Sequence, residues 1–434
     1  MLKYIKSNYG ICLIFALGIT LRFIGLNQIN EPIFDEIFYP QYGLMYLQGK
    51  EFFYAHPPFA NYLYSLAIWL YSLTPLFEAE SLDKVNFYEM SVISYRWLNA
   101  LIGSLLIPVI YGISNLLYKN RFFALLAALF IAIEGSLIVD SRTALANMFL
   151  LFFGFSSIYF LLKFLNKNSQ SSILFIAAFF MGITVSIKWN GLGFLFISIL
   201  CIIQSEKLSK KNMVVKSLIS YLFVTSSLYI FFFLPDLLLN TQYGFVEKHQ
   251  QMFGYHNTMV SSNEHPYCSE WFSWPILIKP IAYYFSQEYF SGIQWFTNVH
   301  LLPNPFLNWL SFLAIAIVIV CYSSSVLKHR LIENGSQKIS LVLSVGFLIN
   351  LLPWSMVDRC LFLYHYQPSY IFAILALAFL LSKLLEKNGA LSKVFPILII
   401  SVVMVAFLYW LPIQLGFEIP DYEFYRRMWF DSWI

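Results

Sequence analysis

The sequence has few charged residues for its length. Asp, Glu, Lys and Arg together make up 12% of the 434 residues, whereas a soluble globular domain usually carries about 25%. Apolar stretches instead recur along the whole chain, on the scale needed to cross the roughly 30 Å of hydrocarbon in a bilayer. The scarcity of charge therefore excludes a set of soluble domains and predicts an all-α polytopic membrane protein.

Phosphate-binding loops and metal-ligand spacings are also missing. There is no glycine-rich loop, Walker motif or nucleophile elbow, so a nucleotide-driven pump is disfavoured. The five cysteines show no metal spacing, and His256 and His265 lack the helical spacing of a metal site. We therefore expect no metal and no other cofactor. The net charge of +4 is too small to indicate a nucleic-acid partner.

Eleven apolar segments are candidate membrane spans, and short basic segments between them set the orientation. Cytoplasmic loops carry an excess of Lys and Arg, and eleven crossings place every basic loop inside, with the N-terminus inside and the C-terminus outside. The spans are 11–26, 98–118, 122–139, 148–165, 173–187, 191–203, 214–234, 307–327, 339–354, 369–385 and 395–413. The orienting residues are Lys3, Lys6, Lys119, Arg121, Lys163, Lys167, Lys207, Lys210, Lys211, Lys328, Arg330, Lys383, Lys387 and Lys393.

The segment Phe59–Leu76 is apolar enough to cross as well. A crossing there would move Lys119 and Arg121 outside and reverse the later loops. We therefore expect this segment to lie in the interface or to re-enter the protein.

This topology gathers the acidic, basic and histidine residues of the loops on the outer side. Two long outer loops, 27–96 and 235–304, hold most of them. Cys268 and Cys360 also fall in outer segments, which makes them candidates for a disulfide. The chain is predicted to divide into a catalytic transmembrane module (1–234, including loop 27–96), an aromatic-rich outer loop (235–304) and a C-terminal four-helix transmembrane module (305–434). A transporter would instead show inverted repeats and interrupted helices with polar residues at the midplane.

Adjacent acids, Asp35 and Glu36, stand in an aromatic segment shortly after the first span. Desolvation opposes ionising both of them. One interpretation is a general base for a hydroxyl, with the second acid orienting a partner. The alternative is a solvated helix start, where acids are favoured.

Four cations lie near the outer ends of spans, where an unpaired charge is costly. Arg22 and Arg96 can each pair with a carboxylate or bind a phosphate through two hydrogen bonds. Glu36 is the acid nearest to Arg22 in sequence, so an Arg22–Glu36 pair is one interpretation. Arg142 and Lys188 suit the phosphate of a lipid whose chain lies in the bilayer, or else simply extend to the interface.

Aromatic residues are dense in the loop 235–304. Faces such as that of Trp274 can stack on sugar rings, but they can equally form the aromatic belt of the membrane interface. Three histidines of the outer loops, His56, His256 and His265, are further candidates for the site.

Seven sequence blocks, in order along the chain, resemble the protein O-mannosyltransferase family of the GT-C superfamily. They cover nearly the whole chain. The blocks are Phe34-Asp35-Glu36 with Tyr39, His56-Pro57-Pro58, Tyr95-Arg96 followed by Gly103–Pro108, Ser141-Arg142 with Met148-Phe149-Leu150, Ser186–Gly191, His265–Ser269 with Trp274-Pro275 and Pro280, and Leu352-Pro353-Trp354 with Tyr364-His365-Tyr366.

The resemblance implies a GT-C glycosyltransferase fold of about eleven transmembrane helices with two long outer loops. It implies an inverting transfer of mannose from a polyprenyl (dolichyl-type) phosphate to Ser or Thr hydroxyls of exported proteins, at the outer face of the inner (plasma) membrane, without a required metal. The implied catalytic residues are Asp35, as base, and Glu36. The implied donor or phosphate contacts are Arg22, Arg96, Arg142, Lys188 and His56. His256, His265 and Trp274 are weaker candidates for contacts to the acceptor or the sugar.

Two features depart from the family pattern, and one alternative function stays open. The family usually carries an acid where this chain has Asn147, and the loop 235–304 is too short for the β-trefoil insertion of eukaryotic members. The chain therefore resembles the compact bacterial form. A related GT-C transferase that moves a lipid-phosphate-linked sugar, aminoarabinose or another, onto a glycolipid or glycan would use nearly the same site.

Overall fold

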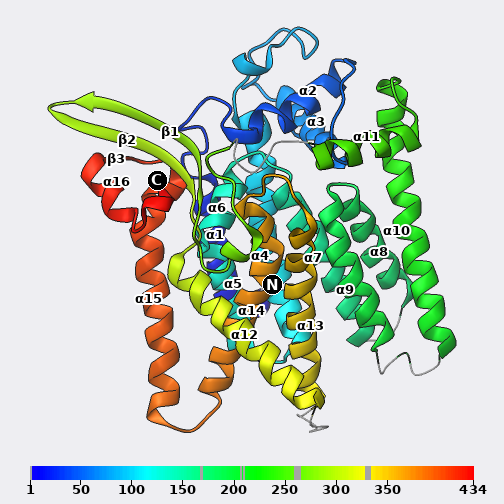
Figure 1. The fold of residues 1–434 in the computed structure, drawn as a ribbon, viewed down its shortest axis with the longest axis vertical. Helices are drawn as coiled ribbons and strands as arrows, with labels where there is room; N and C mark the ends of the chain where they lie inside the picture. Colours follow the sequence, from blue (N-terminus) through cyan, green and yellow to red (C-terminus); the bar gives the residue numbers. More distant parts are fainter. Residues whose placement is uncertain (1, 167–169, 206–207, 209–210, 259–264, 328–333) are drawn as a thin grey trace. The chain divides into compact units, whose positions relative to one another are not determined.

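The computed structural model describes residues 2–166, 170–205, 208, 211–258, 265–327 and 334–434 (Figure 1). Most of the described chain is helical. The α-helices are α1 (Leu2–Phe23), α2 (Tyr39–Leu47), α3 (Phe59–Ser72), α4 (Ile93–Leu117), α5 (Arg121–Ile133), α6 (Gly135–Arg142), α7 (Asn147–Asn166), α8 (Ser171–Val185), α9 (Leu192–Ile203), α10 (Lys211–Leu239), α11 (Phe245–Thr258), α12 (Pro305–Leu327), α13 (Asn334–Leu351), α14 (Gln367–Leu385), α15 (Ala390–Leu415) and α16 (Asp421–Arg427).

Short 3-10 helices and three strands complete the fold. The 3-10 helices are η1 (Phe34–Ile37), η2 (Phe87–Glu89), η3 (Trp189–Gly191), η5 (Trp271–Ser273), η6 (Leu352–Met356), η7 (Leu363–Tyr366) and η8 (Asp431–Trp433). The strands are β1 (Ile281–Phe290), β2 (Ile293–Leu301) and β3 (Glu418–Pro420).

The membrane-spanning character of the chain is confirmed, whereas the count of eleven spans is not. Within the described residues, seven helices are long and apolar enough to cross a bilayer, or eight if α5 and α6, bent by 55° at their junction, form one span. Three shorter apolar helices, Tyr9–Phe23, Ser171–Val185 and Trp189–Ile203, occupy the remaining predicted spans. Lys167, Lys207, Lys210, Lys328 and Arg330, which the predicted orientation uses, lie outside the described residues.

The segment Phe59–Leu76 forms the single helix α3, which has 14 residues. A helix of that length extends about 21 Å, short of the hydrocarbon thickness. One face of α3 is buried through Ala60, Tyr64 and Ala67, while Leu66 and Trp69 on the other face are exposed. This short two-faced helix suits the predicted interfacial position.

The chain folds as two compact units. One comprises Arg22–Leu105 and Asp140–Ser261, and the other comprises Met1–Leu21, Leu106–Val139 and Ser262–Ile434. The three-part division along the sequence stays a prediction.

In the first unit, α7 and α10 both pack against α8, and α2 packs against α3. Hydroxyl groups form hydrogen bonds between these apolar helices. The Ser157 hydroxyl donates to the Ala177 carbonyl oxygen (2.7 Å) and lies 2.8 Å from the Tyr221 hydroxyl. Such interhelical hydrogen bonds stabilise helix pairs in a membrane, where packing brings little hydrophobic gain.

In the second unit, α14 is the central helix. It packs against α5, α12, α13 and α15, and nearly all its side chains from Gln367 to Ser382 are buried. A helix that is apolar on every side needs partners on every side, which explains its central place in the C-terminal bundle.

A three-stranded antiparallel sheet with the order β1-β2-β3 also belongs to this unit, and the all-α prediction missed it. The residues Ser291 and Gly292 connect β1 to β2, with φ values of +53° and +79°. Two successive residues with positive φ are typical of the tight turns whose twist matches that of a hairpin. The sequence predicted an aromatic-rich loop at β1, but aromatic residues are also favoured in strands.

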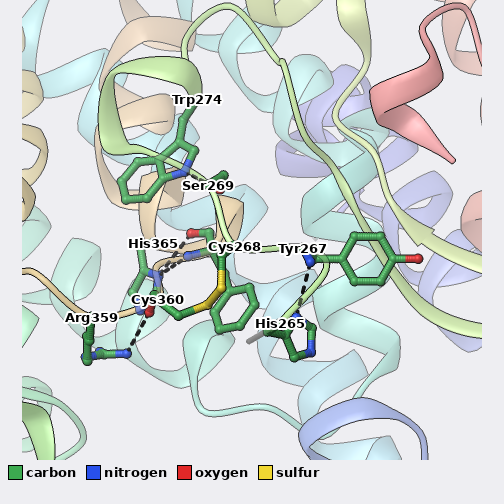
Figure 2. The surroundings of a disulfide bond; sticks show 9 residues. His265, Tyr267, Cys268, Ser269, Trp274, Arg359, Cys360 and His365 are labelled. Carbon is green, nitrogen blue, oxygen red and sulfur yellow. Dashed lines mark hydrogen bonds between the residues drawn. A yellow bond between two sulfur atoms is a disulfide. The ribbon is translucent and has the colours of Figure 1, made fainter. Parts of the chain in front are cut away.

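The candidate disulfide between Cys268 and Cys360 is confirmed (Figure 2). It joins segments separated by 92 positions in the sequence. The Ser269 amide donates to the Leu361 carbonyl oxygen beside it (2.9 Å). Closing so long a loop removes conformations from the unfolded chain, and the bond fixes the segment around Cys268 to the segment that precedes α14.

Candidate active site

The acidic pair lies in η1, on the segment that connects α1 to α2. The residue before it, Phe34, has a φ of +49°, a left-handed conformation that bulky side chains rarely adopt. Residues held in such conformations cluster at functional sites, where the surrounding structure imposes them. The unusual backbone conformation next to Asp35 therefore favours a functional role for this segment.

The Asp35 carboxylate is half-buried, and within the described part of the chain no hydrogen bond is donated to it. Burial raises the pKa of Asp35 from 3.8 to about 6; the Lys188 ammonium opposes this increase and the Asp140 carboxylate adds to it. A carboxyl group with a pKa near the working pH can accept a proton and release it again. Asp35 therefore has the properties of a general base.

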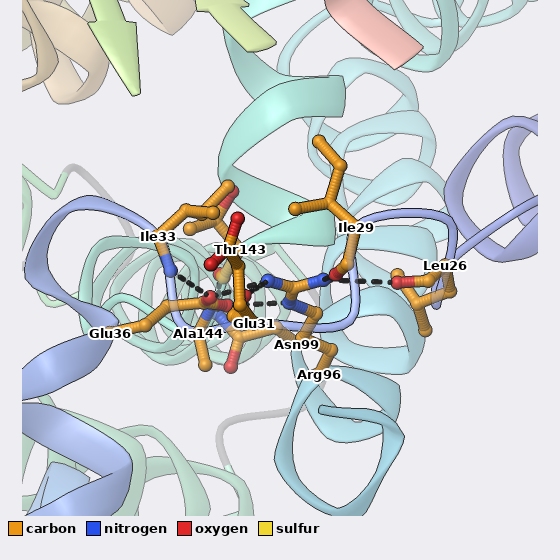
Figure 3. Close-up of polar contacts among 9 residues, drawn as sticks. All are labelled: Leu26, Ile29, Glu31, Ile33, Glu36, Arg96, Asn99, Thr143 and Ala144. Atoms are coloured by element: carbon orange, nitrogen blue, oxygen red, sulfur yellow. Dashed lines mark hydrogen bonds and ion pairs between the residues drawn. The ribbon is translucent and has the colours of Figure 1, made fainter. Parts of the chain in front are cut away.

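Glu36, the second acid of the pair, has a different environment. Figure 3 shows its carboxylate facing the guanidinium group of Arg96, both side chains being almost fully buried. Arg96 Nε donates to Glu36 Oε1 (2.8 Å) and Arg96 Nη2 to Glu36 Oε2 (2.6 Å). The Ile33 and Ala144 amides also donate to this carboxylate, at 2.9 Å and 2.8 Å. Glu36 is therefore a fully hydrogen-bonded structural anion.

The Arg96 guanidinium binds the segment after α1 as well. Its Nη1 donates to the Leu26 and Ile29 carbonyl oxygens (3.2 and 2.7 Å), and its Nη2 donates to the Glu31 carbonyl oxygen (2.8 Å). With the two bonds to Glu36, these contacts use all five N–H groups of an arginine. The pairing of Glu36 with Arg22, which sequence proximity suggested, is wrong: the first turn of α4 brings Arg96 to Glu36 instead.

Arg22, in the last turn of α1, and Arg142, the last residue of α6, join these two helix ends. Arg22 Nε donates to the Ser141 hydroxyl (3.0 Å), and a Cβ atom on Gly103 would come within 2.1 Å of the same hydroxyl oxygen. Glycine at position 103 therefore makes room for this contact. Arg142 donates to the carbonyl oxygens of Ile24 (2.5 Å) and Gly25 (3.1 Å), which follow the last turn of α1, where carbonyl groups have no partner within the helix.

Lys188 lies in a buried polar chain that includes Asn147 and Asp140. Lys188 Nζ donates to Asn147 Oδ1 (2.9 Å), and Asn147 Nδ2 donates to Asp140 Oδ2 (3.2 Å). The ammonium group also lies 5.4 Å from the ring centre of Tyr39, within the range of a cation–π interaction. Lys188 and Asp140 are both close enough to Asp35 to affect its pKa.

His56 and His256 lie together in the same unit. Their ring centres are 4.9 Å apart, and the Tyr54 ring is 5.3 Å from that of His56. Trp189, next to Lys188 in sequence, lies 6.0 Å from the His256 ring. The structure thus brings His56 and His256, from segments 200 positions apart, to one aromatic cluster.

Sequence reasoning missed Tyr54 as a candidate. Its buried hydroxyl has no hydrogen-bond partner among the described residues, and it lies close enough to Asp35 to interact electrostatically. Burial, first of all, raises the pKa of the Tyr54 hydroxyl well above its ordinary value, so the group stays protonated as a donor. Its position two residues before His56 is the only sequence signal for it.

His265 and Trp274 belong to the other compact unit. The Trp274 indole is buried, donates to the Ser269 hydroxyl (2.9 Å) and stacks on His365 (Figure 2). His265 Nδ1 accepts a hydrogen bond from the Tyr267 amide (3.2 Å). Burial lowers the pKa of His265, as does Lys279. These contacts surround the disulfide, so both residues shape the segment beside it.

The described part of the chain offers no cluster of metal-binding side chains. Among the described residues, no three His, Cys, Asp or Glu side chains lie close enough together to hold a metal ion.

Two family models match this chain. Residues 12–247 match the model described as dolichyl-phosphate-mannose-protein mannosyltransferase. Residues 241–433 match the C-terminal four-span region of protein O-mannosyltransferases.

Two curated relatives illustrate the similarity in sequence. The polyprenol-phosphate-mannose–protein mannosyltransferase of Corynebacterium glutamicum is 23% identical, over 98% of this chain and 94% of its own. Protein O-mannosyl-transferase 1 of Mus musculus is 28% identical over 55% of this chain, and the match covers 36% of that longer protein.

Solved structures identify the fold. The protein O-mannosyltransferase Pmt1-Pmt2 complex of Saccharomyces cerevisiae, bound to the sugar donor, matches 99% of this chain and 93% of its own chain, with a TM-score of 0.86 at 15% identity. ArnT of Cupriavidus metallidurans matches 94% of this chain and 65% of its own, with a TM-score of 0.59 at 12% identity. This chain is a multi-pass membrane glycosyltransferase with the GT-C fold, and it belongs to the dolichyl-phosphate-mannose–protein mannosyltransferase family.

Proposed function

We propose that this protein transfers mannose, with inversion, from a polyprenyl phosphate to Ser or Thr hydroxyls of exported proteins, and that Asp35 is the base. One observation carries the assignment of Asp35. Its carboxylate receives no hydrogen bond from the described residues, although its neighbour Glu36 receives four. Of the two acids, Asp35 is therefore the one available to a substrate hydroxyl.

The reaction is a single displacement. As the acceptor oxygen forms its bond to the anomeric carbon, the bond between that carbon and the phosphate oxygen of the donor breaks. Asp35 takes the proton of the hydroxyl, and the lipid phosphate leaves with the electron pair and its negative charge. An inverting transfer needs one base opposite the leaving group and no covalent intermediate.

Lys188 and His56 remain our proposed contacts to the donor. Lys188 keeps an ammonium group beside Asp35, and a positioned cation stabilises the negative charge that develops on a departing phosphate. Tyr54 can donate a hydrogen bond to the sugar or the phosphate. His256, next to His56, is the proposed acceptor-side contact.

The arginines are proposed to position the site. The N–H groups of Arg96 donate to Glu36 and to the segment after α1. Arg142 donates to the carbonyl oxygens that follow α1. Arg22 packs in full burial against Ser141. These contacts support a role in holding the segment that carries Asp35, in place of the phosphate contact that the resemblance implied.

We further propose that the site faces the periplasm or exterior from the inner membrane. Disulfides persist in oxidising compartments, and Cys268 and Cys360 are joined. The distribution of Lys and Arg independently assigns both cysteine segments to the outer side, together with the loop that carries Asp35. The disulfide and the Lys and Arg distribution, which involve different residues, thus support the same side.

A comparison of cells with and without the gene distinguishes a protein acceptor from a glycolipid acceptor. We expect cells with the gene to carry hexose on Ser or Thr of exported proteins, and cells with the gene deleted to lack it. Mass spectrometry of the exported proteins and of the lipid fraction is the measurement. Hexose lost only from the lipid fraction would support the glycolipid alternative and contradict the protein acceptor.

A further inference from the structure

Asn147 occupies an unusual position between two buried charges. Its amide oxygen accepts a hydrogen bond from Lys188 and its amide nitrogen donates one to Asp140. The three side chains are at most 8% exposed. Only one orientation of the amide is compatible with these neighbours, because a flip would turn the amide nitrogen toward the ammonium group and the oxygen toward the carboxylate.

This arrangement gives the cluster one positive and one negative charge next to the base. A buried ammonium group is costly without a nearby anion, and two buried carboxylates in contact repel each other. Because Asn and Asp have the same shape, the carboxylate and the amide could exchange positions without a change in volume. The total charge beside Asp35 would then stay the same.

We propose that Asp140 and Asn147 act as one acid–amide pair that positions Lys188 beside Asp35, and that the pair needs one carboxylate at either of the two positions. The inference rests on the proposed function, since Lys188 serves the donor phosphate and Asp35 is the base. Both members are positioning residues, acting on the reaction through Lys188 and Asp35.

The pair is tested by exchanging its members. Asp140→Asn leaves the pair with two amides and no carboxylate. Asn147→Asp gives it two carboxylates at hydrogen-bond distance from each other. We expect each single variant to lower kcat by about tenfold or more, the scale of one buried hydrogen bond to a charged group. We expect Asp140→Asn/Asn147→Asp to recover to within about threefold of wild type, because contacting residues are strongly non-additive.

The pH dependence of transfer distinguishes positioning from a purely structural role. The charged groups that affect Asp35 are Lys188 and Asp140, and the neighbouring Tyr54 hydroxyl is itself affected by Asp35. Removing the negative charge of Asp140 should move the acidic limb of the profile to lower pH, and adding one at Asn147 should move it to higher pH. The exchanged double variant should return the limb to the wild-type position.

A second readout makes the result independent of the proposed function. Thermal unfolding in detergent is measured for the same four proteins and for Asn86→Asp, which adds the same charge at an exposed position in the outer loop. We expect both single variants to melt below wild type and the double variant to recover most of the loss. If wild type transfers no mannose, the proposed function fails and the melting cycle alone decides the pair. Additive losses in the double variant, in melting or in kcat, would overturn the inference.

Discussion

Asp35→Asn is expected to abolish mannose transfer while the protein still folds and binds polyprenyl phosphate. Loss of a positioned base costs about 10²–10⁴-fold in rate. The Asp35 carboxylate contributes no hydrogen bond to the fold among the described residues, so its replacement by the isosteric amide should leave the melting temperature close to that of wild type. The measurement is kcat of purified protein with polyprenyl-phosphate-mannose and a Ser/Thr peptide, together with thermal unfolding.

Asp83→Asn is the matched control for this variant. Asp83 lies in the same outer loop and is exposed, so the same chemical change there should leave kcat unaltered. Full activity in purified Asp35→Asn would refute the assignment of the base. An equal loss of activity in both variants would point to the net charge of the loop instead.

Arg96→Ala is expected to have the largest effect on stability. It removes five hydrogen bonds and leaves the Glu36 carboxylate buried without its counter-ion. Breaking a buried ion pair in this way costs about 3–5 kcal/mol. We expect a greatly lowered melting temperature and low yields in detergent, and Arg96→Lys should recover only part of the loss, because an ammonium group cannot reproduce the planar two-bond contact.

The exposed pair Lys84–Glu80 supplies the control for Arg96. Its N···O distance of 2.8 Å is similar, but its side chains are 74% and 80% exposed, and exposed pairs contribute about 0–1 kcal/mol. Lys84→Ala should therefore leave the melting temperature almost unchanged. Replacing both buried partners, Glu36→Leu with Arg96→Met, should be less harmful than Arg96→Ala, because no charge is left unpaired. Equal melting temperatures for Arg96→Ala and Lys84→Ala would contradict the structural role of Arg96.

The sequence predicted the membrane character and the acidic pair, because both leave local signals. Long apolar stretches need no tertiary information, and adjacent acids among aromatic residues stand out in any such protein. The different environments of Asp35 and Glu36 could not be predicted from the sequence. Which acid is fully hydrogen-bonded depends on Arg96, 60 positions away, and on the Ala144 amide, 108 positions away. The nearer Arg22 was a plausible partner only because proximity along the chain was the available guide.

Asn147 shows a second limit of prediction from the sequence. It was recognised as a departure from the family pattern, but its meaning depended on Asp140, seven positions earlier. The two residues meet because the chain turns between α6 and α7, and a turn of that kind is set by tertiary packing. The hairpin of β1 and β2 could have been predicted from the Ser291-Gly292 pair between aromatic runs, but the aromatic composition favoured an interfacial loop.

The pH dependence of kcat in the wild-type protein tests most directly whether Asp35 is the base and works from a raised pKa. A base must be ionised to accept the proton, and burial raises the pKa of Asp35 to about 6. Transfer should therefore be constant above that pH and fall about tenfold per pH unit below it. A rate that stays constant down to about pH 4, the ordinary range of an aspartate, would contradict the assignment of Asp35 as a base with a raised pKa.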